Sequence, residues 1–198
     1  MKTKHFSVIG AVILCMTMIS NAKAQSTVDD KESAHLFVQK FYDWYGVLDA
    51  AHEPGSKTPS PYILTLKHKP SYLQNTLLDA LIADDQAQEK ANEIVGLDFD
   101  PFTNAQDTRS GYQTGNVVQK GIYYFIDVHD IKSGAVRNAV LAAPLVLTAE
   151  VTKIDGQWKF FNFIYPKEDG GYNLLDILKN LRNDRAKWAA EGNKKIKR

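Results

Sequence analysis

Apolar residues in the first half of the chain repeat with the period of α-helices. Between about Asp30 and Tyr45 they lie three or four residues apart, which predicts an amphipathic helix with one buried stripe. That stripe consists of Ala34, Phe37, Val38, Phe41 and Tyr45. A second helix is predicted after Pro70, because Ser71 and Gln74 have the spacing of a capping box. It is expected to fray near Asp84-Asp85. Its inward residues are expected to be Leu73, Leu77, Leu78, Leu81 and Ile82.

The second half of the chain changes to the period of strands. Alternation from Val117 to Asp130 predicts one half-buried strand. Its buried face is expected to hold Val118, Ile122, Tyr124, Ile126 and Val128. Leu145–Ile154 and Gln157–Tyr165 predict a hairpin around Asp155-Gly156. A closing helix is expected from an Asn173 cap to about Trp188. This order favours an α+β fold, with N-terminal helices packed on a curved antiparallel sheet and a C-terminal helix.

The predicted hairpin is apolar on both faces. A two-residue turn at Asp155-Gly156 places Val151 opposite Phe160 and Leu147 opposite Ile164. One face then carries Trp158, Phe160 and Ile164, and the other carries Phe161, Phe163 and Tyr165. Both faces need a cover, which we expect to be helices together with another strand layer, the last helix or a second subunit.

The start of the chain has the pattern of an export signal. Lys2 and Lys4 precede a mostly apolar run from Phe6 to Ile19, and Ala22-Lys23-Ala24 supplies a cleavage site. We therefore interpret residues 1–24 as a signal peptide. The run is short for a bilayer span and no second long run follows, so no stable membrane insertion is expected. The predicted location is the periplasm of a bacterium.

Composition restricts the remaining chain further. Of the 198 residues, we expect 25–190 to form a single domain and 191–198 a basic flexible tail. With 24 basic and 23 acidic side chains, the chain lacks the basic footprint of a nucleic-acid binder. The single cysteine, Cys15, lies within the predicted signal peptide. The exported product therefore has no thiol nucleophile, thiolate metal site or disulfide, which suits an oxidising compartment.

Three segments of the chain resemble one bacterial family. They are Glu93–Asp107, which reads EIVGLDFDPFTNAQD, and the flanking Phe37–Tyr45 and Asn173–Arg182. Together they resemble an uncharacterised family, domain of unknown function 3828, over about residues 33–186. The resemblance implies a cystatin-like cone of the nuclear transport factor 2-like superfamily and an exported protein. Some members are lipidated, but this chain lacks a usable lipobox. The resemblance implies no reaction and no catalytic residue.

A polar cluster lies within the first of these segments. It consists of Asp98, Asp100, Asn104 and Asp107. Its oxygens suit a hard cation, but an EF-hand loop needs Gly at position six and Glu at position twelve, where this chain has Thr103 and Arg109. We therefore predict no metal and no cofactor. The favoured interpretation is a turn in which side chains bind their own backbone amides, and the alternative is a partner contact.

A second group of polar residues lies on the strands. Tyr123, Asp127 and His129 fall on one face of the predicted strand 117–130. Histidine beside a carboxylate can act as a general base, so these residues are candidates for a pocket. The favoured interpretation is that they form the solvated side of an edge strand. Asn162 is predicted to line a pocket or to cap a backbone group.

The sequence contains no recognised catalytic motif. We therefore predict a non-catalytic periplasmic binding protein that recognises another protein, for example an immunity protein that neutralises a toxin, or a second copy of itself. Partner-binding candidates are Asp98, Asp100, Asn104, Asp107, Phe161, Phe163 and Tyr165. The alternative is a protein with a pocket for a small apolar ligand, or an isomerase-like or hydrolase-like enzyme. That alternative requires Tyr123, Asp127 and His129 to face a cavity of at least roughly 300 Å³.

Overall fold

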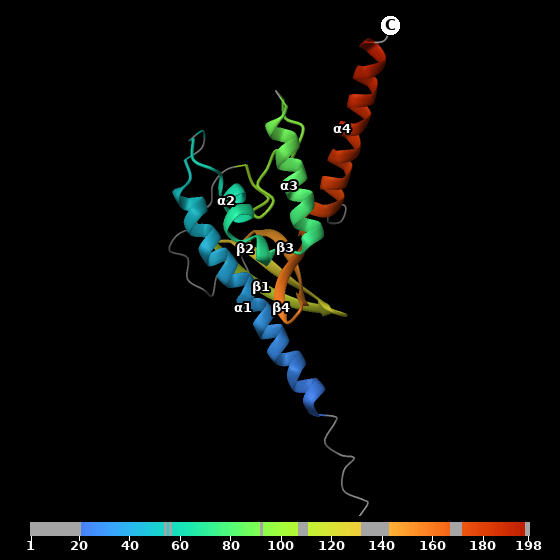
Figure 1. Cartoon of the computed structure of the whole chain (residues 1–198). Coiled ribbons are helices and arrows are strands. Elements are labelled where there is room, and N and C mark those ends of the chain that lie inside the picture. Colours follow the sequence, from blue (N-terminus) through green and yellow to red (C-terminus); the bar gives the residue numbers. More distant parts are fainter. Residues whose placement is uncertain are drawn as a thin grey trace, which may run out of the picture.

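The computed structural model describes residues 21–53, 55, 57–91, 93–106, 111–131, 143–166 and 172–196, with side chains described only between Asp30 and Ala190. Three α-helices and one short 3₁₀ helix precede the sheet, and one α-helix follows it (Figure 1). The elements are α1 (Asn21–Ala51), α2 (Pro61–His68), the 3₁₀ helix η1 (Pro70–Tyr72), α3 (Asn75–Glu89), β1 (Tyr112–Lys120), β2 (Tyr123–Asp130), β3 (Leu145–Ile154), β4 (Gln157–Tyr165), β5 (Tyr172–Asn173) and α4 (Leu174–Ile196).

The strands form one antiparallel sheet in the order β1-β2-β3-β4-β5. Each strand pairs with its neighbour in sequence, so all connections are local. Asp155 and Gly156 have φ values of 51° and 75°. Two positive φ values at the turn are required by the type I′ turn, whose twist matches that of the strands. The predicted α+β class and the hairpin of β3 and β4 are confirmed.

Helix α1 packs against β1, β2 and β3 and carries the predicted stripe into the core. Of the stripe, Phe37 is half-buried and the other residues are fully buried. The Phe41 ring lies 4.8 Å from Phe160 and 5.5 Å from Phe102. Such edge-on contacts add stabilisation beyond the burial of area. One side of α1 therefore joins the sheet to the segment around Phe102.

The predicted strand over 117–130 is wrong in its extent. The chain turns at Gly121, which has φ of 62°, and Ile122, so two strands replace one. Ile122 is 69% exposed in this turn, and Val118 is also exposed. Tyr124, Ile126 and Val128 are buried as predicted. Alternation alone could not locate the turn because the apolar pattern continues through it.

The start of the second predicted helix is also corrected. The Gln74 side chain, not Ser71, caps α3, by accepting hydrogen bonds from the backbone N–H of Thr76 (2.7 Å) and Leu77 (3.3 Å). The Gln74 N–H donates to the Phe160 carbonyl at 2.9 Å. This bond to β4 holds the chain extended just before the helix.

Helix α3 does not fray at Asp84-Asp85 but continues to Glu89. Asp84 is only 3% exposed and pairs with Arg185 of α4 at 2.6 Å. The predicted inward residue Ile82 is exposed instead. Two adjacent acidic residues suggested that the helix ends at Asp84-Asp85. The partner that neutralises Asp84 lies 101 residues away, beyond the reach of a local pattern.

The apolar pattern did not predict α2. Its N-terminus is capped by the Ser60 hydroxyl, which accepts from the Ile63 N–H, and Pro61 occupies the first turn. Tyr62 donates its hydroxyl hydrogen to the Leu81 carbonyl at 3.0 Å. This bond joins α2 to α3 and positions the Tyr62 ring.

A β-bulge changes the predicted register of β3 and β4. Val151 lies opposite Phe160 as predicted, but Glu150 lies opposite Asn162, so Ile164 pairs with Thr148 and not with Leu147. The extra residue turns the following side chains to the other face. Phe163 and Tyr165 consequently point into the core and are 0% exposed.

Helix α4 begins as predicted after Asn173, whose Oδ1 accepts from the Asp176 N–H at 3.0 Å. It does not end near Trp188 but continues to Ile196, into the segment expected to be a tail. Its C-terminal half extends away from the rest of the domain (Figure 1). Trp188 is 55% exposed there.

No helix within the described ranges combines the length and the hydrophobicity needed to cross a membrane. The apolar run Phe6–Ile19 of the predicted signal peptide lies outside the described residues.

Candidate functional site

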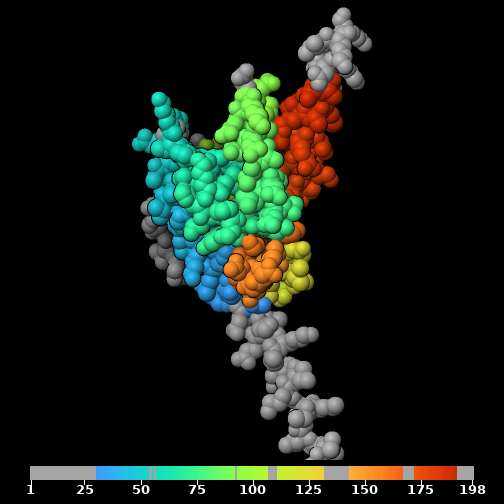
Figure 2. Space-filling model, in the orientation of Figure 1, coloured from blue at the N-terminus to red at the C-terminus, as the bar shows by residue number. Residues whose placement is uncertain are grey.

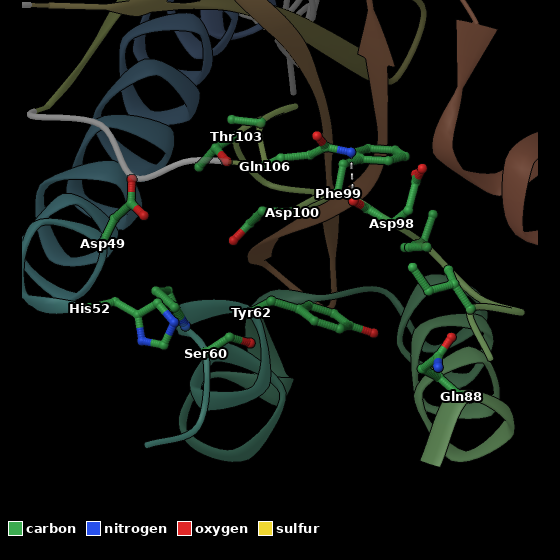
Figure 3. A pocket seen from close by; sticks show the side chains of 14 residues that line it. Asp49, His52, Ser60, Tyr62, Gln88, Asp98, Phe99, Asp100, Thr103 and Gln106 are labelled. Carbon is green, nitrogen blue, oxygen red and sulfur yellow. Dashed lines mark hydrogen bonds between the residues drawn. The ribbon is translucent and has the colours of Figure 1, made fainter. Parts of the chain in front are cut away.

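A cavity of about 400 Å³ lies where the end of α1, the start of α2, the end of α3 and the segment 94–106 meet. Figure 3 shows this cavity with Asp100 at its centre, between the α1 residue Asp49 and Tyr62 of α2. His52, Asp98 and Gln106 also line it. The cavity is therefore built from four separate segments of the chain, and three of its lining side chains are aspartates.

Asp100 is half-buried at the centre of this arrangement. One carboxylate oxygen accepts the hydroxyl hydrogen of Tyr45, and the other accepts the Phe102 N–H at 2.8 Å. Burial of the carboxylate raises the pKa of Asp100 from its ordinary 3.8 to about 6, although both hydrogen bonds oppose the shift. Repulsion from the nearby charge of Asp49 contributes to the raised pKa. Asp100 therefore changes its charge within the range of environmental pH.

The segment that carries Asp100 is held by tyrosine hydroxyls. Tyr42 donates to the Phe102 carbonyl and Tyr165 to the Pro101 carbonyl, each at 2.8 Å. The Asn104 N–H donates to the Asp100 carbonyl at 2.9 Å, and Asn104 takes a positive φ of 49° that asparagine tolerates. These bonds fix the backbone from Asp100 to Asn104, so the Asp100 carboxylate is preorganised.

A second carboxylate at the cavity, that of the buried Asp49, belongs to α1. Tyr112 of β1 donates its hydroxyl hydrogen to Asp49 at 2.5 Å. Burial first, and then this hydrogen bond, raise the pKa of Tyr112. Tyr45 likewise has a raised pKa, caused by burial and by the charge of Asp100. Both phenols therefore stay protonated and act as hydrogen-bond donors to carboxylates.

The cavity is electrostatically one-sided. Among the described residues that line it, His52 is the only side chain able to carry a positive charge. No basic side chain in the described part of the chain forms an ion pair with Asp100. Since burying a carboxylate without a cation is costly, a cation entering the cavity would be stabilised by Asp100. No group of three or more His, Cys, Asp or Glu side chains suited to hold a metal ion occurs among the described residues.

The predicted polar cluster is only partly brought together. Asp98 and Asp100 line the cavity, whereas Asn104 donates its side-chain N–H to the Val146 carbonyl at 3.4 Å. Asp107 lies outside the described residues. The interpretation as a turn that binds its own amides is confirmed for Asp100, through the Phe102 N–H.

Two of the aromatic candidates for partner binding are not on a surface. Phe163 and Tyr165 are fully buried because of the bulge, and Phe163 lies 5.1 Å from Phe160. Phe161 is half-buried on the opposite face, with its ring 4.9 Å from that of Tyr123. The expectation that all three rings share one face of the hairpin is therefore wrong.

The strand residues proposed for a pocket are bound separately. Asp127 accepts from the Thr148 hydroxyl at 2.9 Å, and His129 Nδ1 lies 3.0 Å from the Ala143 carbonyl oxygen. None of the three candidates, Tyr123, Asp127 and His129, lines the cavity of about 400 Å³ around Asp100.

Asn162 caps a backbone group, which is the second of its two predicted roles. Its Oδ1 accepts from the Phe163 N–H at 3.0 Å and from the Leu175 N–H at 3.2 Å. Leu175 lies in the first turn of α4, where N–H groups lack partners within the helix. Asn162 therefore connects β4 to the start of α4.

Most residues of the cavity were missed by the sequence analysis, among them Asp49, His52 and Tyr62. Asp49 lies four residues after Tyr45, which continues the buried stripe of α1 with an acidic side chain. A carboxylate at a core position is the signal that could have identified it. His52 and Tyr62 carry no comparable signal.

Comparisons with protein-family models, with curated proteins and with solved structures found no match to this chain. The resemblance to domain of unknown function 3828 and its implied cystatin-like cone therefore stay predictions.

Proposed function

We propose that this protein is an exported, non-catalytic binding protein that recognises another protein, and that its cavity receives a basic side chain of that partner. The observation that carries this proposal is Asp100: its carboxylate faces the cavity, and no basic side chain among the described residues pairs with it. A lysine or arginine from outside supplies the missing charge. Neutralisation of a periplasmic toxin is one form of such recognition.

The chemistry of the cavity suits a guanidinium or ammonium group. Asp98 lies at the exposed edge of the cavity and Asp100 in its interior, so an entering side chain meets carboxylates along its length. Hydrogen bonds between charged groups are about twice as strong as neutral ones. The tyrosine hydroxyls hold Asp100 in place before binding, which lowers the entropic cost of association.

Acid–base catalysis at the same cavity is a second candidate, favoured by one observation. A pKa of about 6 for Asp100 is suitable for exchanging protons near neutral pH. Tyr62 and His52 line the same space and supply further polar groups. Turnover of a substrate that is abolished in Asp100→Asn, with binding retained, would favour catalysis over the proposed binding function.

The test uses a fluorescein-labelled peptide of alternating arginine and glycine, followed by fluorescence anisotropy. We expect binding that strengthens from pH 5 to pH 7.5, because a bound cation stabilises ionised Asp100 and protonation competes with it. Asp100→Asn should weaken binding on the order of tenfold and reduce its pH dependence. The variant His52→Gln, measured in parallel, shows how much of the pH dependence of binding comes from Asp100 and how much from His52.

The matched control is Asp155→Asn, which removes an exposed carboxylate from the β3–β4 turn and keeps a residue that tolerates positive φ. This variant should bind as the unmodified protein does. Equal losses in Asp155→Asn and Asp100→Asn would mean that overall charge, and not the cavity, attracts the peptide. That result, or no binding at all, would contradict the proposal for the cavity.

A further inference from the structure

We propose a second binding surface, on the middle of α1, that binds an acidic segment of a polypeptide. It is a surface groove of about 480 Å³, lined by Ser33, Leu36, Phe37, Lys40, Tyr72 and Trp158, with Glu32 at its edge. We call it the lysine–aromatic groove. In Figure 2, this part of α1 (blue) adjoins the tip of the β3–β4 hairpin (orange) on one face of the molecule. The proposal does not depend on the function proposed for the cavity.

The walls of the groove are aromatic and fixed in position. The Phe37 ring lies 5.2 Å from Tyr72 and 5.0 Å from Phe160, so it is anchored to the core. The Trp158 indole N–H donates to the Ser33 hydroxyl at 2.8 Å, which fixes the orientation of its ring. Rings held in this way lose little entropy when a ligand packs against them, and aromatic side chains dominate the affinity of many interfaces.

Apolar surface remains exposed along the groove. Leu36 is 47% exposed, although it lies on the helix that carries the main core stripe. Phe37, Tyr72 and Trp158 are each half-buried. These four side chains offer a contact for aliphatic or aromatic groups of a ligand.

Lysine ammonium groups lie directly over these rings. Lys69 Nζ lies 5.1 Å from the Tyr72 ring centre and 5.3 Å from that of Trp44. Lys153 Nζ lies 5.0 Å from the Trp158 ring centre. Attraction between the ammonium groups and the ring faces holds the lysines beside the groove.

The charge around the groove is predominantly positive. Lys153 forms an ion pair with Asp30. Lys40, Lys69 and Lys159 form no ion pair with a carboxylate in the described part of the chain, and Lys159 donates instead to the Ser71 carbonyl at 3.0 Å. Glu32 is the only acidic residue among those that line the groove.

This combination fits an extended segment with alternating acidic and apolar side chains. The carboxylates would meet Lys40, Lys69 and Lys159, while the apolar groups pack on Leu36 and the rings. Positively charged residues beside a small apolar surface favour such a segment over nucleic acid, which requires a longer basic surface. The exposed side chain of Leu36 favours a ligand with aliphatic side chains over a sugar, because it offers no hydrogen bond to hydroxyl groups.

The test measures fluorescence anisotropy of a fluorescein-labelled peptide of alternating glutamate and leucine. We expect the unmodified protein to bind it, with affinity that falls as salt concentration rises. The double variant Lys40→Glu and Lys69→Glu should weaken binding on the order of tenfold or more, because two attractions become repulsions. The same variant should gain affinity for a peptide of alternating lysine and leucine, a result that an unfolded variant would not give.

Lys179→Glu is the matched control, since it reverses an exposed lysine on α4 away from the groove. It should bind the acidic peptide as the unmodified protein does. The proposal is overturned if no binding occurs or if Lys179→Glu and the double variant weaken it equally. Binding of dextran sulfate or of anionic phosphatidylglycerol vesicles in place of the peptide would also overturn it. The arginine–glycine peptide reports on the cavity, so the two proposals succeed or fail separately.

Discussion

Two aspartates of this protein, the buried Asp84 and the half-buried Asp100, have opposite electrostatic surroundings. Asp84 of α3 accepts the Leu97 N–H at 2.8 Å and is paired with Arg185 of α4 at 2.6 Å. Asp100 has tyrosine and backbone donors but no cationic partner among the described residues, and its pKa is raised to about 6. The first carboxylate is neutralised within the fold and connects two helices. The second keeps an uncompensated charge at a cavity, which is what a binding site for a cation requires.

The largest expected effect follows from removing the cation at Asp84. Arg185→Ala leaves a buried carboxylate unpaired and also removes the bond to the Val95 carbonyl, which is 2.8 Å long. We expect the free energy of unfolding to fall by about 3 to 5 kcal/mol. Urea unfolding at pH 7 measures it. The control Arg182→Ala removes an exposed arginine from the same helix and should change the free energy of unfolding by less than about 0.5 kcal/mol. Similar losses in the two variants would show that the ion pair between Asp84 and Arg185 does not stabilise the fold.

The next effect concerns the pH dependence of stability at Asp100. The folded protein holds this proton more tightly than the unfolded chain, so ionisation of Asp100 lowers stability as pH rises from about 4 to about 6. A shift of about two pH units corresponds to about 3 kcal/mol. Asp100→Asn removes this contribution, so the stability of the variant relative to the unmodified protein should rise over that interval. Urea unfolding at pH 4.5 and pH 7 measures the difference, and parallel changes in both proteins would contradict the assignment.

A smaller loss of stability is expected when the Asp84 carboxylate is displaced from its position. An added Cβ at Gly96 lies 2.7 Å from Asp84 Oδ2, so Gly96→Ala must move the carboxylate or the loop. We expect a loss of about 2 kcal/mol, measured by thermal and urea unfolding. In Gly46→Ala on α1 the nearest contact is an ordinary 3.6 Å, and this control should be neutral or stabilising. Equal behaviour of the two variants would mean that Asp84 has room to move.

The smallest effect tests the tyrosine donor at Asp100. Tyr45→Phe removes the hydroxyl that donates to the carboxylate and should cost about 1 to 2 kcal/mol at pH 7. Because this hydrogen bond lowers the pKa of Asp100, its removal should raise that pKa further. NMR titration of the Asp100 carboxyl carbon measures the change. An unchanged or lower value would show that the hydrogen bond does not stabilise the ionised form.

Local patterns predicted the elements whose stabilising interactions are close in sequence. The stripe of α1 from Ala34 to Tyr45 is correct because helical spacing puts these side chains on one face. The turn at Asp155-Gly156 is correct because few residue pairs accept two positive φ values. The Asn173 cap is correct for a similar local reason.

Predictions failed where a distant contact decided the outcome. The extension of α3 depends on Arg185, which lies 101 residues beyond Asp84. The bulge beside Val151 turned Phe163 and Tyr165 from the predicted outer face into the core. No periodic pattern marks such an insertion, because the segment is apolar on both alternating sets of positions.

The sequence by itself determined the α+β class, the amphipathic face of α1 and the hairpin turn, since each follows from residues within about four positions of one another. Only the tertiary structure decided which aspartates are neutralised and which face a cavity. Asp49, Tyr62 and Asp100 meet from separate segments, and the charge state of a buried carboxylate depends on everything that surrounds it in space.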